Sequence, residues 1–114
     1  MREDHDGLEV VAFEDVSGLR AWLDGAGTNH PGVWVRLQRA RSPHPSVTFH
    51  ELLVEGIAFG WSESARHAYD DRSYLQRFTP RRTRGTTSER NRRIAAELEE
   101  AGRMTDAGRA ALGL

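Results

Sequence analysis

Residues 59–82 have the sequence FGWSESARHAYDDRSYLQRFTPRR, in which two strand-like runs flank a short polar segment. We predict that residues 61–69 and 74–79 form an antiparallel hairpin. The turn is expected at residues 70–73, because Asp and Ser side chains readily bond to nearby backbone groups. Pro80 cannot donate a backbone hydrogen bond, so it is expected to end the second strand.

Hydrophobic spacing on both sides of the hairpin predicts the remaining elements. They are a strand at 9–13, a helix from Asp15 or Ser17 through Ala26, a strand at 32–39, a helix at 48–60, a helix at 88–102 and a short helix at 106–112. Together they predict an α+β fold, with a small, mostly antiparallel sheet of about four strands packed against three to four helices. We expect residues 1–114 to form one domain with a disordered tail at residues 1–8.

The helix at 48–60 carries the clearest local signals. Thr48 followed by Glu51 is a capping box, which fixes the start of a helix. Gly56 and Gly60 lie on its apolar stripe, although glycine costs about 1 kcal/mol relative to alanine inside a helix. We therefore expect this helix to approach the sheet closely, and Gly60 to end it.

The composition excludes several classes of protein. The chain of 114 residues has no cysteine, which excludes disulfides, thiolate catalysis and cysteine-bound metals. Its polar, acidic start lacks a secretory signal, and no apolar run is long enough for a membrane span. The five histidines lack the spacing of a zinc site, so no metal and no cofactor are predicted. We expect a soluble, cytoplasmic protein.

Basic residues gather in one part of the chain. Residues 72–93 contain eight arginines and one acid, whereas residues 1–71 contain six arginines and twelve acids. All basic residues are arginine, which either reflects the codon usage of a GC-rich genome or serves planar, bidentate binding of anions. A strongly positive segment in a chain of net charge −1 is the strongest electrostatic signal in the sequence.

The charges of the helix at 88–102 run against its dipole. Arginines occupy its first turns at positions 90, 92 and 93, and glutamates occupy positions 97, 99 and 100. The helix dipole favours the opposite order by roughly 0.3–1 kcal/mol per charge. Only Arg93 and Glu97 have the spacing of a helical ion pair. We interpret the reversed order as a mark of an anion-binding site at the start of this helix.

These observations predict a surface that binds a phosphate, a carboxylate or another anionic group. The predicted ligand-binding residues are Arg77, Arg81, Arg82, Trp61, Ser88, Asn91 and Arg92, with Trp61 as an apolar wall. The expected partner is an anionic small molecule or a protein, and no catalytic residue is assigned. The alternative for the same arginines is a solvated surface that neutralises nearby acids.

Two alternative functions are considered for the same arginine-rich part of the chain. A nucleic-acid-binding protein would use the block from Arg72 to Arg93, although few aromatic residues are placed to stack on bases. An enzyme would need a base beside the anion, for which His67, Asp70 and Glu63 are the candidates. We expect His67 to be a surface residue; the alternative is that it pairs with Asp70 or Asp71 across the hairpin and acts as a base.

Six motifs together resemble the YdeI/OmpD-associated family of bacterial proteins, also labelled bacteriocin-protection proteins. They are PGVWV at 31–35, PSVTF at 45–49, FGW at 59–61, YLQRFTPRR at 74–82, the segment at 88–91 and AGRMT at 101–105. The resemblance runs from about residue 13 to residue 112, and LQRFTPRR is its most specific part.

The resemblance implies a role in envelope stress or in resistance to antimicrobial peptides, with no settled enzymatic activity. We therefore expect a non-enzymatic binding protein. Longer relatives continue into a helical C-terminal segment, which this chain lacks after Leu114. The family usually has Gly-Trp-Ile-Asp-Gly where this chain has GWSES at 60–64, and a Trp where this chain has Thr87. Both departures would alter a pocket built from those residues.

Overall fold

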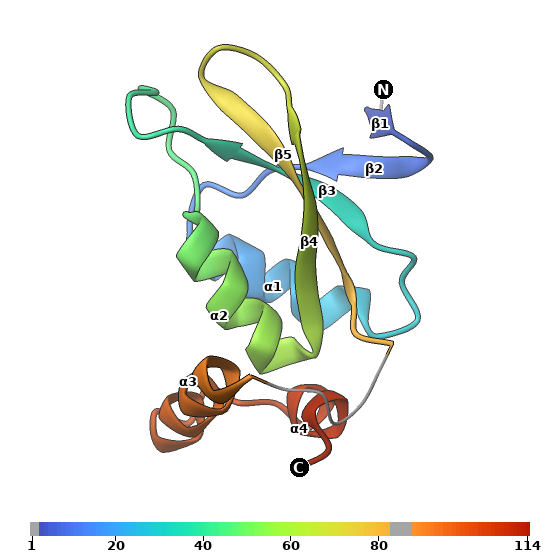
Figure 1. Cartoon of the computed structure of the whole chain (residues 1–114), viewed down its shortest axis with the longest axis vertical. Coiled ribbons are helices and arrows are strands. Elements are labelled where there is room, and N and C mark those ends of the chain that lie inside the picture. Colours follow the sequence, from blue (N-terminus) through green and yellow to red (C-terminus); the bar gives the residue numbers. More distant parts are fainter. Residues whose placement is uncertain (1–2, 83–87) are drawn as a thin grey trace.

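The computed structural model describes residues 3–82 and 88–114, and within them it shows an α+β fold (Figure 1). The described elements are β1 (Asp4–His5), β2 (Leu8–Val11), α1 (Val16–Ala26), β3 (Val33–Gln38), α2 (Phe49–Phe59), β4 (Trp61–Ala68), β5 (Ser73–Pro80), α3 (Glu89–Glu100) and α4 (Asp106–Leu112). The predicted fold class and the central hairpin, β4 and β5, are confirmed.

The described strands form one five-stranded sheet in the order β1-β2-β3-β5-β4. β2 and β3 are parallel, and the other neighbouring pairs are antiparallel. A parallel pair needs a long crossover, which α1 provides between β2 and β3. The prediction of about four strands missed β1, and it did not foresee the parallel pair.

The extra strand lies inside the predicted disordered tail at residues 1–8. β1 pairs with β2 through a two-residue turn, in which Asp6 has φ 48° and Gly7 has φ 79°. Asp-Gly is a strong hairpin signal, because both turn residues must adopt positive φ. The structure therefore places residues 4–8 in a hairpin, while residues 1–2 lie outside the described residues.

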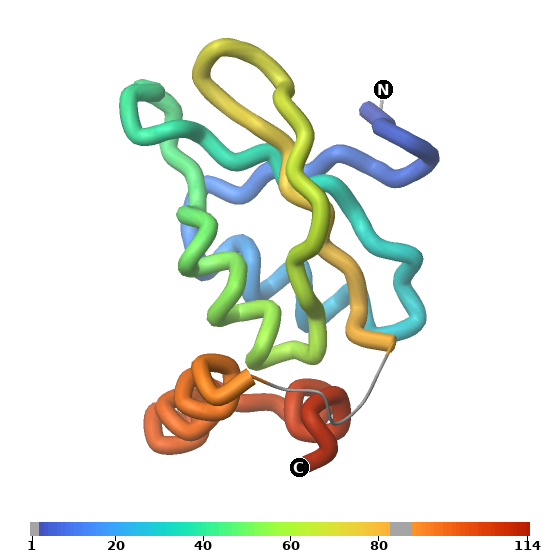
Figure 2. Tube along the Cα trace, viewed as in Figure 1, coloured from blue at the N-terminus to red at the C-terminus, as the bar shows by residue number. Residues whose placement is uncertain are grey.

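The main core lies between one face of the sheet and the helices α1 and α2. Side chains at alternate positions of β3 and β5 meet apolar side chains of both helices; members of this core include Val33, Val35, Leu37, Phe78, Leu19, Leu23, Leu52 and Ile57. Helices α3 and α4 pack against α2 at one end of the molecule, and the N-terminal hairpin lies at the other end (Figure 2).

Side-chain caps begin each helix where the sequence predicts them. Asp15, rather than Ser17, caps α1 by accepting a hydrogen bond from the Gly18 amide at 2.9 Å. The capping box of α2 is complete, with both reciprocal bonds between Thr48 and Glu51 formed at 2.9 and 3.0 Å. These caps satisfy backbone donors that a helix start would otherwise leave unpaired.

The two glycines of α2 serve different contacts. A Cβ atom on Gly56 would lie 2.9 Å from a ring carbon of Phe78, so the predicted close approach to the sheet is confirmed there. Gly60 ends α2 with φ 81°, a conformation that favours glycine. A Cβ atom on Gly60 would lie 2.8 Å from the Ala107 carbonyl oxygen, so this glycine makes room for α4 and not for the sheet.

Helix α4 docks on the end of α2 through backbone contacts. The Ala58 carbonyl oxygen, unpaired within α2, accepts hydrogen bonds from the Thr105 amide at 3.2 Å and from the Thr105 hydroxyl at 2.5 Å. Gly108 lies directly over this turn, and a Cβ atom there would lie 2.7 Å from the Ile57 carbonyl oxygen. The docking therefore requires a residue without a side chain at position 108.

We expect Gly108→Ala to lower the free energy of unfolding by about 2 kcal/mol, because α4 must move off the end of α2. Gly25→Ala is the matched control. Nothing lies within 4 Å of a Cβ atom at position 25 of α1, so this change should stabilise the protein by about 0.5–1 kcal/mol. Urea unfolding measures both, and a Gly108→Ala variant as stable as the wild type would contradict the docking.

Candidate anion-binding groove

Arg81 and Arg82 follow β5 directly and reach the end of α2. The Arg81 amide donates a hydrogen bond to the Gly60 carbonyl oxygen at 2.8 Å, which holds the chain against the last turn of α2. A cavity of about 230 Å³ opens at this point. Its described lining residues are Thr28, Gly60, Arg81, Arg82, Ala107, Ala110 and Ala111. We call this cavity the anion end, because two arginines line it.

The side chain of Arg81 is incompletely paired. Its Nε atom is buried and has no hydrogen-bond partner among the described residues. A buried donor without a partner costs roughly 1–3 kcal/mol, so native proteins rarely leave one without a reason. Arg81 also lines the anion end, whose other described lining residues, apart from Arg82, have small side chains or none.

Trp61 is buried in the core and does not form an exposed wall. It is 1% exposed, and its ring lies 5.1 Å from that of Phe78, 5.4 Å from that of Trp22 and 5.6 Å from that of His30. Its position at the start of β4 explains this burial, because the residue faces α1 and the core side of β5. Trp61 is therefore a core residue that also lines a cavity, and its role as an apolar wall stays a prediction.

That cavity adjoins the anion end. It has a volume of about 330 Å³ and is lined by Leu23, Asp24, Gly27, Thr28, Phe59, Trp61, Thr105, Asp106 and Ala107. Thr28 and Ala107 line both cavities, so the two are neighbours between α1, α4 and the end of β5, and we call the pair the groove. We call the larger cavity the apolar end of the groove.

Arg77 lies apart from this groove. It is exposed and pairs across the sheet with Trp34, while its neighbours Gln76 and Phe78 are buried toward the helices. Alternation along a strand therefore turns Arg77 to the face that lacks α1 and α2. Four residues of strand also separate it from Arg81 by roughly 13 Å along the chain. The structure does not bring these two predicted site residues together.

The start of α3 is also separate from the groove. Ser88 caps the helix by accepting a hydrogen bond from the Asn91 amide at 3.1 Å, and the Asn91 side chain accepts from Arg90. None of Ser88, Asn91 and Arg92 is among the described residues that line the cavity at Arg81. Arg84 lies outside the described residues.

One of the late acids of α3, Glu99, has a structural explanation. Glu99 accepts two hydrogen bonds from Arg109 of α4, at 2.6 and 2.8 Å, and Arg109 also bonds Asp106 at 2.8 Å. The hydrogen bond from Arg109 lowers the pKa of Glu99 below its ordinary value. Within the described residues, Arg93 and Glu97 do not form the ion pair that their spacing suggests. The acid at position 99 of α3 therefore serves a contact with α4, and it does not need an anion at the start of α3 to explain it.

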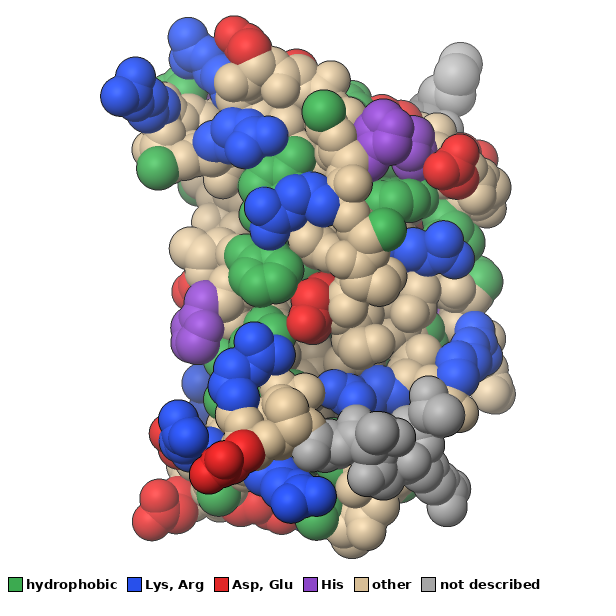
Figure 3. All heavy atoms as spheres, viewed as in Figure 1, with side chains coloured by type: hydrophobic (Ala, Val, Ile, Leu, Met, Phe, Trp, Pro, Cys, Tyr) green, Lys and Arg blue, Asp and Glu red, His purple; other side chains and the backbone are tan. Residues whose placement is uncertain are grey.

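The arginine-rich block does not gather into one patch. Arg72 lies in the turn between β4 and β5, at the end of the molecule opposite α3. On the face shown in Figure 3, basic side chains are scattered from one end to the other among apolar and acidic ones. This arrangement offers no continuous basic track on that face.

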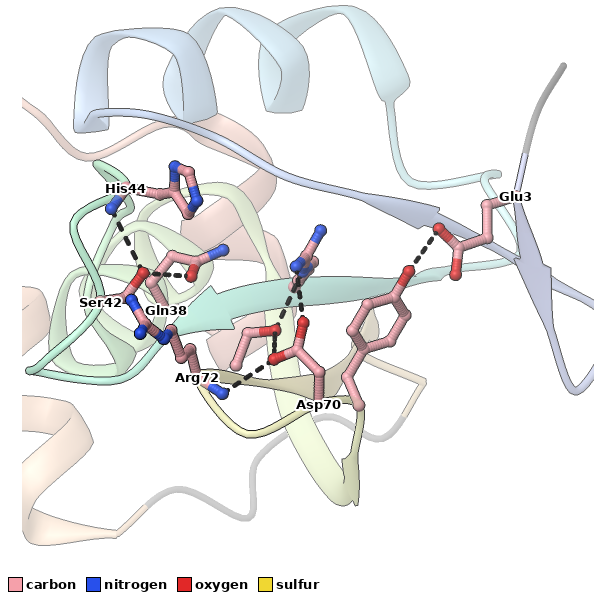
Figure 4. Close-up of polar contacts among 9 residues, drawn as sticks. Glu3, Gln38, Ser42, His44, Asp70 and Arg72 are labelled. Atoms are coloured by element: carbon pink, nitrogen blue, oxygen red, sulfur yellow. Dashed lines mark hydrogen bonds and ion pairs between the residues drawn. The ribbon is translucent and has the colours of Figure 1, made fainter.

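Asp70 holds the hairpin turn together. Its carboxylate accepts hydrogen bonds from the Ser73 hydroxyl at 2.7 Å and the Arg72 amide at 2.9 Å, and pairs with Arg36 at 2.9 Å (Figure 4). The bond from Ser73 is the main cause of a lowered pKa of Asp70. These bonds confirm the predicted turn. A carboxylate that stays ionised in this way is a weak general base, so a structural role is favoured for Asp70 over a catalytic one.

His67 does not pair with Asp70 or Asp71. Its Nδ1 atom lies 2.8 Å from the Ala68 carbonyl oxygen, and its ring packs 4.5 Å from that of His5 in β1. Glu63 lies opposite Phe78 in the sheet. None of the three candidate bases lines either end of the groove. Within the described residues, no group of three His, Asp or Glu side chains is arranged to hold a metal ion.

Sequence reasoning missed the most buried charge in the described structure. Glu55 of α2 is 2% exposed and pairs with Arg20 of α1 and, at 2.5 Å, with Arg103 in the segment between α3 and α4. Arg20 also donates to the Arg103 carbonyl oxygen at 3.2 Å. The sequence did contain a signal for this cluster, since Glu55 lies inside the apolar run of α2. A carboxylate buried there needs partners of opposite charge.

A family model, a domain of unknown function (DUF8412), matches residues 11–111, and the chain belongs to this family. A search of the curated proteins and a search of the solved structures each found no match. None of the helices in the described part of the chain has the length and apolar character needed to cross a membrane.

Removal of the buried carboxylate tests the helix contacts. We expect Glu55→Ala to lower the free energy of unfolding by about 3 kcal/mol, the low end for a broken buried pair, because the two arginines regain water. Glu100→Ala, at an exposed position of α3, should change it by less than about 0.5 kcal/mol. Equal stability of the two variants in urea unfolding would show that the ion pairs contribute nothing.

Proposed function

We propose that this member of the DUF8412 family is a non-enzymatic binding protein that holds the anionic group of a small ligand at the anion end of the groove. One observation carries the proposal: Arg81 lines a cavity, and its buried Nε atom has no hydrogen-bond partner among the described residues. Arg81 would be the main contact, and Arg82 would add positive charge at the rim.

The chemistry of arginine supports an anionic ligand. A guanidinium binds carboxylate or phosphate through charge-assisted hydrogen bonds in a planar geometry, and such bonds are roughly twice as strong as neutral ones. No acid is among the described residues that line the anion end. A ligand anion would therefore meet two arginines without a competing carboxylate in the same cavity.

A binding role is favoured over catalysis by what lines this cavity. Apart from the two arginines, its described lining is one threonine, one glycine and three alanines. These residues supply no group that can take up or release a proton near neutral pH. A small ligand is favoured over a nucleic acid, because the arginine-rich block is divided between opposite ends of the molecule.

The family resemblance bears on the physiological role and on the same two arginines. The resemblance to the YdeI/OmpD-associated family suggests a cytoplasmic protein linked to envelope stress or resistance to antimicrobial peptides. Its most specific motif, LQRFTPRR at residues 75–82, includes both Arg81 and Arg82. The motif therefore supports the same two residues as the cavity does.

We expect phosphate and acetate, titrated at constant ionic strength, to shift the amide NMR signals of Gly60 and Thr28 in a saturable way. Arg81→Gln should weaken this binding at least tenfold, since a charged hydrogen bond contributes roughly 1.5–3 kcal/mol. Arg82→Gln should weaken it less, because the residue is exposed.

Arg93→Gln is the matched control, since it removes an exposed arginine of α3 outside the groove. It should leave the affinity unchanged. Unchanged affinity in the Arg81→Gln variant, with its fold intact by circular dichroism, would overturn the proposed site.

A further inference from the structure

The apolar end of the groove differs in chemistry from the anion end. Three buried apolar side chains contribute to its lining: Leu23 at 2%, Phe59 at 8% and Trp61 at 1% exposure. Its charged lining residues are acidic, namely Asp24 and Asp106, whereas those of the anion end are basic. The groove therefore runs from positive charge, past apolar surface, to negative charge.

Asp24 is the carboxylate available to a ligand at the apolar end. It is exposed, and no described residue forms a hydrogen bond or an ion pair with it. Asp106 also lines this end, but its carboxylate accepts a hydrogen bond from Arg109 at 2.8 Å. A cation that enters the apolar end would therefore meet Asp24 without displacing a protein partner.

The position of Asp24 is unfavourable for the helix that carries it. It lies in the last turn of α1, which ends at Ala26, where the helix dipole disfavours negative charge. No basic residue occupies that turn to offset it. A local rule broken without compensation often marks a functional position, and here the residue also lines a cavity.

We propose that the groove selects a dipolar ligand, with its anionic group at Arg81 and Arg82 and an ammonium group at Asp24. This inference rests on the proposed function of the anion end and adds the class of ligand. A short apolar spacer would cross between the two charges beside Phe59 and Trp61. Cavities of about 230 and 330 Å³ suit a small molecule such as an ω-amino acid or a short zwitterionic peptide.

The charge pattern disfavours the simpler alternatives. A ligand with a negative group at both ends would place one of them beside Asp24 and Asp106, where like charges repel. A carboxylate with a plain alkyl chain would bind at Arg81 but would leave Asp24 unpaired. The amine is therefore expected to add affinity only when the spacer lets it reach Asp24.

The test compares ω-amino carboxylates of two to eight carbons with the unsubstituted carboxylates of the same length, by NMR titration of the wild-type protein. At one or more chain lengths the amine should tighten binding by about two- to fivefold, as expected for an exposed ion pair. Asp24→Asn should abolish this advantage and leave the affinity for the unsubstituted carboxylates unchanged. Asp71→Asn, an exposed acid of the hairpin turn, is the matched control and should retain the advantage.

The outcomes separate the two proposals. If Arg81→Gln leaves the binding of every carboxylate unchanged, the proposed function fails and this inference fails with it. If carboxylates bind through Arg81 but the amine adds nothing at any length, the dipolar ligand is excluded alone. Persistence of the amine advantage in the Asp24→Asn variant would equally exclude it.

Discussion

The last turn of α2 fixes the arrangement on which the rest of the molecule depends. Gly60 reverses the chain into β4, and its carbonyl oxygen accepts the amide of Arg81 at the end of β5. Two residues earlier, the Ala58 carbonyl oxygen accepts hydrogen bonds from Thr105 at the start of α4. Unpaired helix-end carbonyls thus join the sheet, α2 and α4 at one place, and the groove lies there.

Four arginines form ion pairs that hold parts of the fold together. Arg20 and Arg103 neutralise the buried Glu55, and Arg109 bonds Glu99, so these side chains tie helices together. Arg36 does the same for the hairpin turn through Asp70. Arg81 differs, because its buried Nε atom lacks a partner among the described residues. This contrast, rather than the density of charge along the chain, singles out the candidate site.

Local signals in the sequence predicted much of the fold and only part of the site. Capping at Thr48 and alternation along β5 are properties of neighbouring residues, so they could be recognised in the sequence. The partners of Glu55 come from α1 and from the segment after α3, which no local pattern reveals. Arg77 was grouped with Arg81 by its position in the chain, although alternation along the strand already placed it on the opposite face from the core.

A crystal structure of the protein grown in phosphate at neutral pH would test the central claim most directly. The account predicts an anion within hydrogen-bonding distance of the Arg81 Nε atom, beside Gly60 and Ala107. An anion bound instead at Ser88 and Asn91 of α3, with none at Arg81, would contradict it. That result would return the site to the start of α3, where the charge order of the sequence first suggested it.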